Sequence, residues 1–327
     1  MSNLSSIGKI LIAGLCSSVL LSSIHAKEEH DAQKIADIFY TLNGDKNNPH
    51  KKINHTKGFC ATGEFLPAKG ITKTLDIPLL SQKSIPTQVR FSLGGGNPNA
   101  SDKSKARGLA LKLNGKTDNW EMVVLNTEIN FAKNPKEFWD FFAMKVPKNG
   151  KVDTKNIQKR TQQVASFRNY EAYLAKMGIT GSVANTMYHS IHTFFVKDSK
   201  TQEILPARFK FVPTNGVSYL SQDELKTKDD NFLESDAKAK LAKKPIEYKM
   251  VLVFANPNDV TNDTTALWSG EHKELEVGTL RVKKYDGTDC NGDVFMPGVL
   301  PSGVGEPQDP LFDLRNSTYA ITFGRRQ

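Results

Sequence analysis

The chain contains few cysteines, and they are not spaced as metal or redox motifs. Cys16, Cys60 and Cys290 are the three cysteines among 327 residues. The absence of CxxC, CxxCH and zinc-type spacings argues against a zinc finger, a dithiol redox site and a prosthetic group attached through thioethers. Cys60 and Cys290 could pair in an oxidising compartment, but two cysteines do not make a disulfide framework. Whether they pair is left open by the sequence.

The sequence also lacks an apolar run that could comfortably span a bilayer. An apolar run at 10–21 follows Lys9 and is followed by the small residue Ala26 and a charged stretch at 27–29. This order is typical of a secretory signal peptide and not of a membrane anchor. We therefore expect a signal peptide over residues 1–26, export to the periplasm, and no membrane span in the mature chain.

No basic stripe, phosphate loop, repeat or interdomain linker is present. The formal net charge is +9, but the lysines are scattered and not interleaved with aromatics, so we expect a solvated surface and no nucleic-acid partner. The glycine-rich stretch at 94–98 lacks the Lys-Ser/Thr pair of a phosphate loop. The sequence therefore predicts a single domain over residues 27–327.

Hydrophobic periodicity predicts a mixed α+β fold. Several strands of alternating pattern are bounded by Gly, Asn or Asp, and helical patterns are inserted between them, which indicates an antiparallel α+β barrel. The predicted strands are 58–66, 88–93, 107–113, 120–125, 192–198, 205–212, 246–255 and 273–285, and the predicted helices are 31–43, 135–145, 154–177, 221–243 and 309–323.

Six short motifs carry a family resemblance through their order. They are HTKGFCATGEF at 55–65, VRFS at 89–92, ARGLALK at 106–112, NT at 126–127 followed by Phe131 and Phe138, HTF at 192–194, and an Arg-x-x-x-Tyr pattern from Arg315 to Tyr319. Each motif is weak alone, but together and in this order they resemble the catalase family. The resemblance implies an antiparallel eight-stranded β-barrel with inserted and flanking helices, and haem b buried between barrel and helices.

The resemblance assigns one side of the haem to the last helix. Tyr319 would be the axial iron ligand as phenolate. A free Tyr has a pKa near 10, so a neighbouring cation is needed, and Arg315 lies one helical turn earlier on the same face. His192 resembles a family residue behind this proximal side, where a structural hydrogen-bonding role is equally open.

The opposite, distal side is assigned to the first motifs. His55 would take a proton from the bound peroxide and return it to the leaving oxygen. Asn126 would donate a hydrogen bond to the peroxide, and Ser92 would fix the tautomer and tilt of His55. Phe131 and Phe138 would wall this pocket or serve as ordinary core residues.

The haem propionates are assigned to basic residues. Arg107 and Arg326 would pair with the carboxylates as forks. Lys52 stands where catalases carry an arginine, and it would act as a point charge. Asn54 and Leu93 also depart from the family, which has Val before the distal His and Thr after the serine.

The chain ends eight residues after Tyr319, whereas full-length catalases continue with a wrapping segment and a helical domain. We therefore expect a short catalase-related peroxidase without NADPH, monomeric or dimeric. It would reduce hydrogen peroxide or organic hydroperoxides with small organic electron donors and have little catalase activity. Two alternatives stay open: an isomerase of fatty-acid hydroperoxides resembling allene oxide synthases, which also carry a polar residue before the distal His, and a non-catalytic haem-binding protein.

Overall fold

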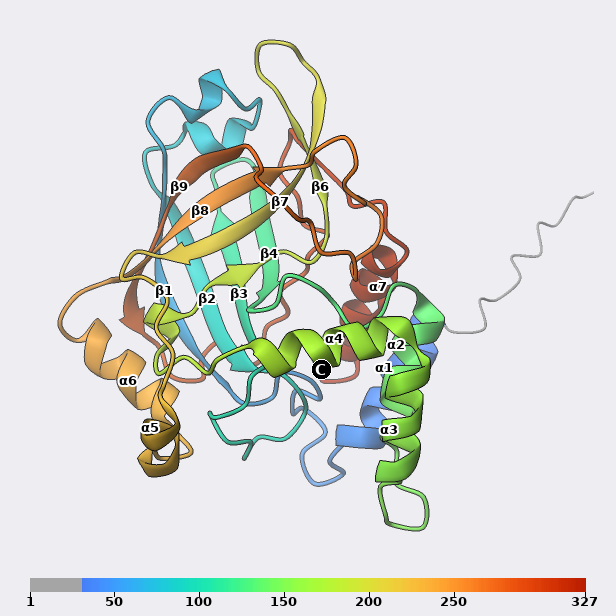
Figure 1. Ribbon diagram of the computed structural model, residues 1–327. Helices are drawn as coiled ribbons and strands as arrows, with labels where there is room; N and C mark the ends of the chain where they lie inside the picture. The colour runs from blue at the N-terminus through green and yellow to red at the C-terminus, as the bar shows by residue number, and fades with distance from the viewer. Residues whose placement is uncertain (1–30) are drawn as a thin grey trace, which may run out of the picture.

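An antiparallel barrel of eight strands forms the centre of the protein (Figure 1). The computed structural model describes residues 31–327, so the predicted signal peptide lies outside the described residues. Strand β7 pairs with both β5 and β8 and so closes the ring, which confirms the predicted eight-stranded barrel. In ring order the strands are β1 (Gly58–Pro67), β2 (Ile85–Leu93), β3 (Arg107–Asn114), β4 (Asn119–Leu125), β5 (Tyr188–His189), β7 (Ile204–Pro213), β8 (Ile246–Phe254) and β9 (Glu274–Tyr285).

Two short strands and three single turns extend the barrel. Strand β6 (Phe194–Lys197) pairs with β7 outside the ring, and β10 (Val304–Gly305) pairs with β6. The predicted strand 192–198 therefore begins two residues late, and His192 precedes it. Single 3₁₀ turns lie at Ile71–Lys73, Pro78–Ser81 and Val183–Asn185.

Side-chain alternation in β2, β3 and β4 separates the barrel core from an outer platform. Phe91 lies opposite Leu109, and both are buried in the barrel core. The residues next to them along each strand point to the other face of the sheet, and on that face Ser92 lies opposite Gly108. The platform residues of the three strands are Arg90, Ser92, Gly108, Ala110 and Val123. Their small and polar side chains leave room above the sheet.

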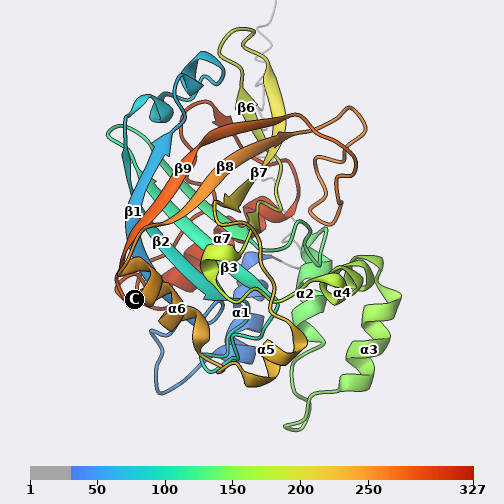
Figure 2. The ribbon, with the colours of Figure 1, turned by 60° about the vertical axis from the view of Figure 1, so that its left-hand side comes forward.

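A layer of helices covers this platform and has its own core. Helices α1 (Ala32–Asn43), α2 (Pro135–Ala143) and α7 (Leu311–Gly324) lie together beside the barrel (Figures 1 and 2). Asp31 caps α1 by accepting a hydrogen bond from the Lys34 amide at 3.0 Å. The apolar faces of α1 and α7 meet in a second core: Ile35, Ile38, Phe39, Ile53, Ala132, Leu311 and Leu314.

Two predicted helices are each split in the structure. The pattern at 154–177 forms α3 (Thr154–Gln163) and α4 (Ala165–Lys176), because Val164 has extended dihedrals, φ −94° and ψ 118°. The pattern at 221–243 forms α5 (Gln222–Thr227) and α6 (Phe232–Leu241). The helical pattern is interrupted at 229–231, where the Asp229 carboxylate competes for backbone hydrogen bonds and accepts from the Asn231 amide at 2.6 Å. Periodicity alone did not reveal either break.

A disulfide crosslinks the barrel to a distant segment. Cys60 on β1 is bonded to Cys290, 230 residues later, and both side chains are 1% exposed. Cys290 belongs to the 286–295 segment, which follows β9 and contains neither helix nor strand. The pairing that the sequence left open is therefore present in the structure.

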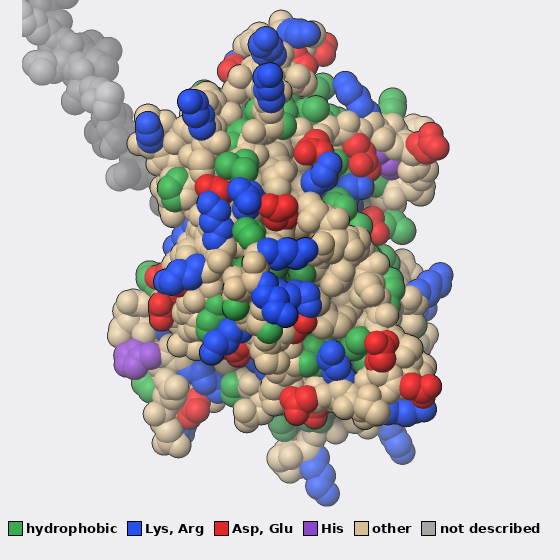
Figure 3. Space-filling model, turned by 90° about the vertical axis from the view of Figure 1, so that its left-hand side faces the viewer, with side chains coloured by type: hydrophobic (Ala, Val, Ile, Leu, Met, Phe, Trp, Pro, Cys, Tyr) green, Lys and Arg blue, Asp and Glu red, His purple; other side chains and the backbone are tan. Residues whose placement is uncertain are grey.

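The face over β1, β8, β9 and α6 carries both signs of charge (Figure 3). Arg281 pairs with Glu247 at 2.7 Å, and Lys249 pairs with Glu276 at 2.8 Å. Exposed ion pairs of this kind contribute little to stability, about 0–1 kcal/mol each, so the charges mainly keep this face solvated.

Within residues 31–327, no helix is both long and apolar enough to cross a membrane.

Candidate active site

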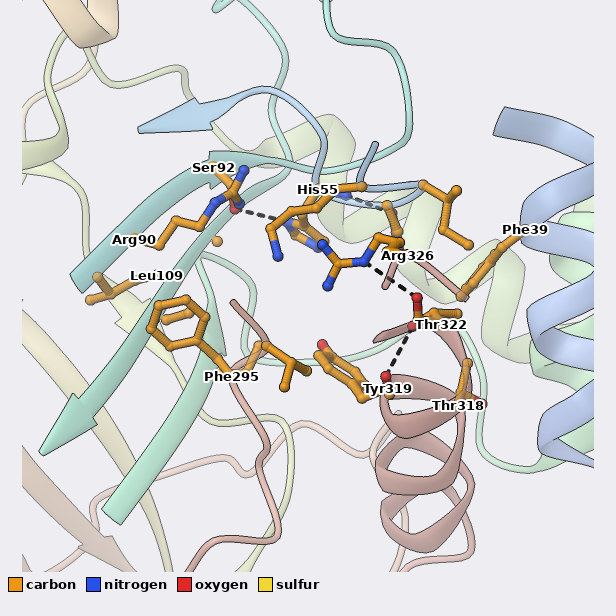
Figure 4. Close-up of a pocket in the computed structure, with 17 residues that line it drawn as sticks. Phe39, His55, Arg90, Ser92, Leu109, Phe295, Thr318, Tyr319, Thr322 and Arg326 are labelled. Carbon is orange, nitrogen blue, oxygen red and sulfur yellow. Dashed lines mark hydrogen bonds between the residues drawn. The ribbon is translucent and has the colours of Figure 1, made fainter. Parts of the chain in front are cut away.

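A cavity separates the platform of the barrel from the helical layer. It has two chambers, which share Phe39, Asn54, His55, Thr318 and Tyr319 in their walls. Figure 4 shows Tyr319 reaching from α7 toward the space on whose other side His55 lies. The two residues predicted to flank the reaction therefore enter one cavity from opposite walls.

Three neighbours hold His55 in its orientation. The residue has a positive φ of 50°, a rare conformation for a non-glycine residue. The Asn54 Oδ1 accepts a hydrogen bond from the His55 amide at 3.0 Å, and the His55 Nδ1 lies 2.9 Å from the Ser92 Oγ. A methyl group on Gly108 would stand 3.0 Å from the imidazole ring. Ser92 therefore makes the contact with the His55 ring that its predicted role requires. The other ring nitrogen of His55, Nε2, is left for a substrate.

Burial keeps the His55 imidazole neutral. Desolvation lowers its pKa to about 4, and the positive charges of Arg90, Arg315 and Lys52 act in the same direction. At neutral pH the ring carries no charge and can accept a proton. This is the protonation state that a general base needs.

A buried hydrogen-bonded chain stands behind Tyr319. The Arg315 guanidinium donates to the Tyr319 hydroxyl oxygen at 3.4 Å and contacts the His192 Nε2 at 2.5 Å. The His192 Nδ1 lies 2.7 Å from a carboxylate oxygen of Asp309. Burial lowers the pKa of His192. Burial is also the largest effect on the pKa of Asp309 and raises it, but the hydrogen bond and charge of His192, the Leu311 amide and the charge of Arg315 together outweigh it, so the Asp309 pKa is lowered.

These pKa directions determine which group donates and which accepts in the hydrogen-bonded chain behind Tyr319. Asp309 is ionised and accepts the Nδ1 proton of a neutral His192, whose Nε2 then accepts from Arg315. Arg315 is thereby held with a second N–H group directed at the Tyr319 oxygen. The structure therefore gives His192 the hydrogen-bonding role behind the proximal side, and it places the Arg315 guanidinium against the Tyr319 hydroxyl oxygen.

One end of the cavity is strongly cationic. Lys52, Arg90 and Arg326 all line the larger chamber. Burial and the charges of Arg326 and Arg90 lower the pKa of Lys52 to about 7, and burial together with Arg326 lowers that of Arg90 to about 10. Among the described groups that shift the Lys52 pKa, Asp293 is the only acid. A buried surplus of positive charge favours an anionic group at this end.

The other end of the cavity is aromatic. Phe131 and Phe138 line the smaller chamber with their ring centroids 5.2 Å apart, and Phe142 lies 5.5 Å from Phe131 in an edge-on arrangement. The same rings pack against the core of the helical layer. The two interpretations left open for Phe131 and Phe138, pocket wall and core residue, therefore both hold.

Comparisons with known proteins identify the family of this chain. The family model described as Catalase matches residues 37–327. The chain belongs to the catalase family. A catalase-related peroxidase of Synechococcus elongatus is 30% identical over 85% of this chain and 84% of its own length. A catalase-related peroxidase of Mycolicibacterium paratuberculosis is 26% identical over 84% and 88%.

Solved catalases share the fold. The structure of a bacterial catalase superposes with a TM-score of 0.75 at 20% identity and covers 84% of this chain, and catalase A from Saccharomyces cerevisiae gives 0.76 at 18% and the same coverage. The chain spans 57% and 61% of the lengths of these two proteins. The matches to catalase-related peroxidases over 84% and 88% of their lengths place the chain in that subgroup of the family, and membership makes it an oxidoreductase that acts on peroxide.

The structure contradicts the role predicted for Asn126 in this catalase-family site. Its Oδ1 accepts from the Arg107 amide at 2.8 Å, and its Nδ2 donates to the Lys105 carbonyl at 2.7 Å. Neither chamber includes Asn126 in its wall, whereas the preceding Leu125 lines the smaller one. Alternation along β4 turns Leu125 to the platform, so Asn126 faces away and spans two backbone segments instead.

Arg107 is also not where the sequence predicted it. Its guanidinium is 2% exposed, bonds the hydroxyl of Thr180 and the Asp102 carbonyl, and lies beside a different pocket from His55. It has no place among the cations of the larger chamber. Arg107 begins β3 on the same face as Leu109, so it points toward the barrel interior.

Arg90 and Asn130 are among the cavity-wall residues that sequence reasoning did not assign. Arg90 lines the larger chamber, and its place between Val89 and Phe91 on an alternating strand could have revealed that it faces the platform. Asn130 lines the smaller chamber and is 3% exposed. No local pattern marks Asn130, because the loop after β4 has no fixed period.

Replacing Gly108 with alanine should displace His55. The new methyl would stand 3.0 Å from Nδ1 and Cε1 of His55 and from the Ser92 Oγ, tighter than ordinary packing. We expect a loss of about 1–3 kcal/mol in the free energy of unfolding, and changed imidazole signals in NMR spectra. Gly324→Ala is the control, because its methyl would meet nothing within 4 Å. Unchanged His55 signals in Gly108→Ala would contradict this geometry.

The buried histidines should make the fold sensitive to mild acid. The folded pKa of His55 is about 4, below its ordinary 6.5, and that of His189 is likewise about 4. Between these values the unfolded chain binds protons that the folded chain does not, so stability falls as the pH drops from 6.5 to 4. Each such histidine contributes a slope of about 1.4 kcal/mol per pH unit. Urea unfolding of wild type and His55→Gln measures how the free energy of unfolding changes with pH. Equal slopes in the two proteins would contradict the low pKa of His55.

Proposed function

We propose that this chain is a haem peroxidase that reduces hydrogen peroxide or organic hydroperoxides with small-molecule electron donors, with little or no catalase activity. One observation carries the proposal: a neutral His55 and an arginine-supported Tyr319 face each other across a cavity that is cationic at one end and aromatic at the other. A cavity of this polarity fits a flat ligand with acidic groups along one edge.

The residues present fit a haem b. Lys52, Arg90 and Arg326 would receive its two propionates, the arginines as forks and the lysine as a point charge. The flat platform over Gly108 and Ala110 leaves room for the macrocycle. Tyr319 would supply the oxygen ligand, and Arg315 would hold it as the phenolate. The two described cysteines are bonded to each other, which agrees with a haem that is not attached through thioethers.

His55 would move the proton in the reaction. When bound, the haem iron supplies the electrons that cleave the O–O bond. The neutral His55 Nε2 accepts the proton of the hydroperoxide and returns it to the leaving oxygen, which departs as water or alcohol. The Ser92 Oγ holds Nδ1 throughout, so the ring keeps its tilt while its protonation changes.

Two amides beside His55 are the available hydrogen-bond donors. Asn54 lines both chambers, and its Oδ1 is engaged by the His55 amide, which leaves the Nδ2 group for a substrate. Asn130 lines the smaller chamber, where its Nδ2 makes only a long contact of 3.4 Å with the Ala132 carbonyl. We propose that they take the donor role first assigned to Asn126.

Departures from the family near His55 support peroxidase over catalase activity. Lys52 replaces an arginine, Asn54 a valine and Leu93 a threonine. The first two line the cavity directly, and Leu93 follows Ser92 on β2. The aromatic wall formed by Phe131 and Phe138 favours substrates with an organic part.

An isomerase of fatty-acid hydroperoxides is the second candidate, favoured by the position of Asn54 in both chambers. Incubation with a lipid hydroperoxide without a donor separates the two. Turnover only after a phenolic donor is added supports the peroxidase, and rapid conversion to an epoxide supports the isomerase.

The buried disulfide agrees with export to an oxidising compartment. The periplasmic location, the lack of NADPH and the monomeric or dimeric state stay predictions.

Tyr319→Phe should abolish the phenolate-to-iron features of the absorption spectrum. Without the phenol oxygen the iron lacks its axial ligand, so the charge-transfer bands and peroxidase activity should both be lost. Tyr219→Phe is the control, because Tyr219 is 58% exposed and should leave the spectrum unchanged. A Tyr319→Phe protein that binds haem with the wild-type spectrum would show that another residue is the ligand.

Asn130→Ala and Asn126→Ala should have opposite effects on activity and stability. Asn130→Ala should lower kcat/KM for peroxide by about 10²-fold, the usual effect of losing one donor to a developing charge. Asn126→Ala leaves two buried backbone groups unpaired and should cost about 1–3 kcal/mol of stability, with kcat/KM of the folded enzyme nearly unchanged. Steady-state kinetics and urea unfolding of both variants test this. A lowered kcat/KM in Asn126→Ala with unchanged kcat/KM in Asn130→Ala would return the donor role to Asn126.

A further inference from the structure

The cationic end of the cavity is held together by the 286–295 segment. The Asn291 Oδ1 accepts from the Arg90 Nε at 2.9 Å, and the Asn291 carbonyl accepts from Arg326 at 3.1 Å. The Asp293 carbonyl accepts from Lys52 at 2.5 Å and from Arg326 at 3.4 Å. Two residues of an irregular segment thus bind all three cations of the larger chamber.

The three cations repel one another and need such a scaffold. The charge of Arg326 lowers the pKa of both Lys52 and Arg90, which shows that the charges act on one another through a poorly solvated space. Flexible basic side chains in this situation turn toward water unless acceptors fix them. The carbonyls of the segment are such acceptors, provided that the segment itself keeps its place.

The disulfide keeps the segment in place. Cys290 lies directly before Asn291, and its bond to Cys60 ties the segment to β1. Backbone hydrogen bonds around Cys60 reinforce the crosslink, from the Cys60 amide to the Gly287 carbonyl at 2.8 Å and from the Asp286 amide to the Cys60 carbonyl at 2.9 Å. The two cysteines also pack against Phe295, which lines the larger chamber.

We propose that the Cys60–Cys290 disulfide and Asn291 are positioning residues that fix the 286–295 segment, and that they thereby preorganise Arg90, Arg326 and Lys52 for the two carboxylates of the prosthetic group. Cations fixed before binding lose less conformational entropy when the anion arrives. The inference rests on the proposed haem function, and neither cysteine nor Asn291 takes part in the reaction itself.

Haem dissociation tests the proposal in the full chain. Cys60→Ser/Cys290→Ser and Asn291→Ala are loaded with hemin, and its transfer to excess apomyoglobin is followed by absorption. We expect dissociation to be faster by roughly 10- to 100-fold, the usual effect of removing an outer-shell partner. Asn291→Asp keeps the acceptor for Arg90 and should restore a rate near that of wild type.

A matched control separates positioning from general stability. Leu111→Ala removes a fully buried side chain from the barrel core and should cost roughly 2–5 kcal/mol without touching the segment. Its haem dissociation rate should equal that of wild type. Loss of haem from Leu111→Ala as fast as from the disulfide variant would overturn the proposal, and so would a wild-type rate in both the disulfide variant and Asn291→Ala.

Two readouts in the apoprotein do not depend on activity. Hydrogen exchange of the 286–295 amides should accelerate in the disulfide variant while β2 and β3 stay protected. The rate of hemin association should fall in wild type as Lys52 deprotonates near pH 7, and in the variants this midpoint should shift upward. Arg326, Arg90, Lys112 and Asp293 are the charged groups that act on Lys52, and the two arginines move away once the segment loosens.

The outcomes distinguish the proposal from the function on which it rests. If wild type takes up no hemin, the proposed function fails, and unchanged exchange of the segment in the disulfide variant would overturn the positioning role independently. If wild type binds hemin and the pH midpoint of the variants equals that of wild type, the function stands and the positioning role is wrong. Faster release, faster exchange and an upward shift together support it.

Discussion

Buried positive charge facing a cavity is the constraint on which the rest of this structure depends. Lys52, Arg90 and Arg326 are too close together and too dry to be stable without acceptors or an anionic ligand. Backbone carbonyls of the 286–295 segment accept from Lys52 and Arg326, the Asn291 side-chain amide accepts from Arg90, and a disulfide links this segment to β1. Burial is the main cause that keeps His55 neutral, and the charges of Arg90 and Lys52 act in the same direction.

In the opposite wall of the cavity, the polar and charged groups are paired with one another. Asp309, His192 and Arg315 form a chain in which each group is oriented by the next, and it ends at the Tyr319 oxygen. Such a chain directs a guanidinium at a phenol without leaving an unpaired charge in the helical layer. A cation-rich edge and a fully hydrogen-bonded proximal chain together suit the proposed haem, whose carboxylates need cations and whose iron would need the Tyr319 oxygen.

Much of the fold could be predicted from the sequence, because strand alternation is a local property. Seven of the eight ring strands have nearly the predicted bounds. The two-residue strand β5 was not predicted, and the predicted strand 192–198 corresponds to β6, which lies outside the ring. The failures have local causes as well. Extended dihedrals at Val164 and the bond from the Asn231 amide to the Asp229 side chain split two helices whose apolar periodicity looked continuous. Periodicity records which face is apolar, but it does not record where the backbone stops being helical.

The sequence by itself determined the barrel, the family resemblance, and the motifs that bring His55, Ser92, Arg315 and Tyr319 to one cavity. Only the tertiary structure decided which polar residues share that cavity. Asn126 faces backbone carbonyl and amide groups while Asn130 lines the wall. The physical reason is that a shift of one residue along a strand reverses the face of the sheet, and that loops which meet in space are not adjacent in the chain.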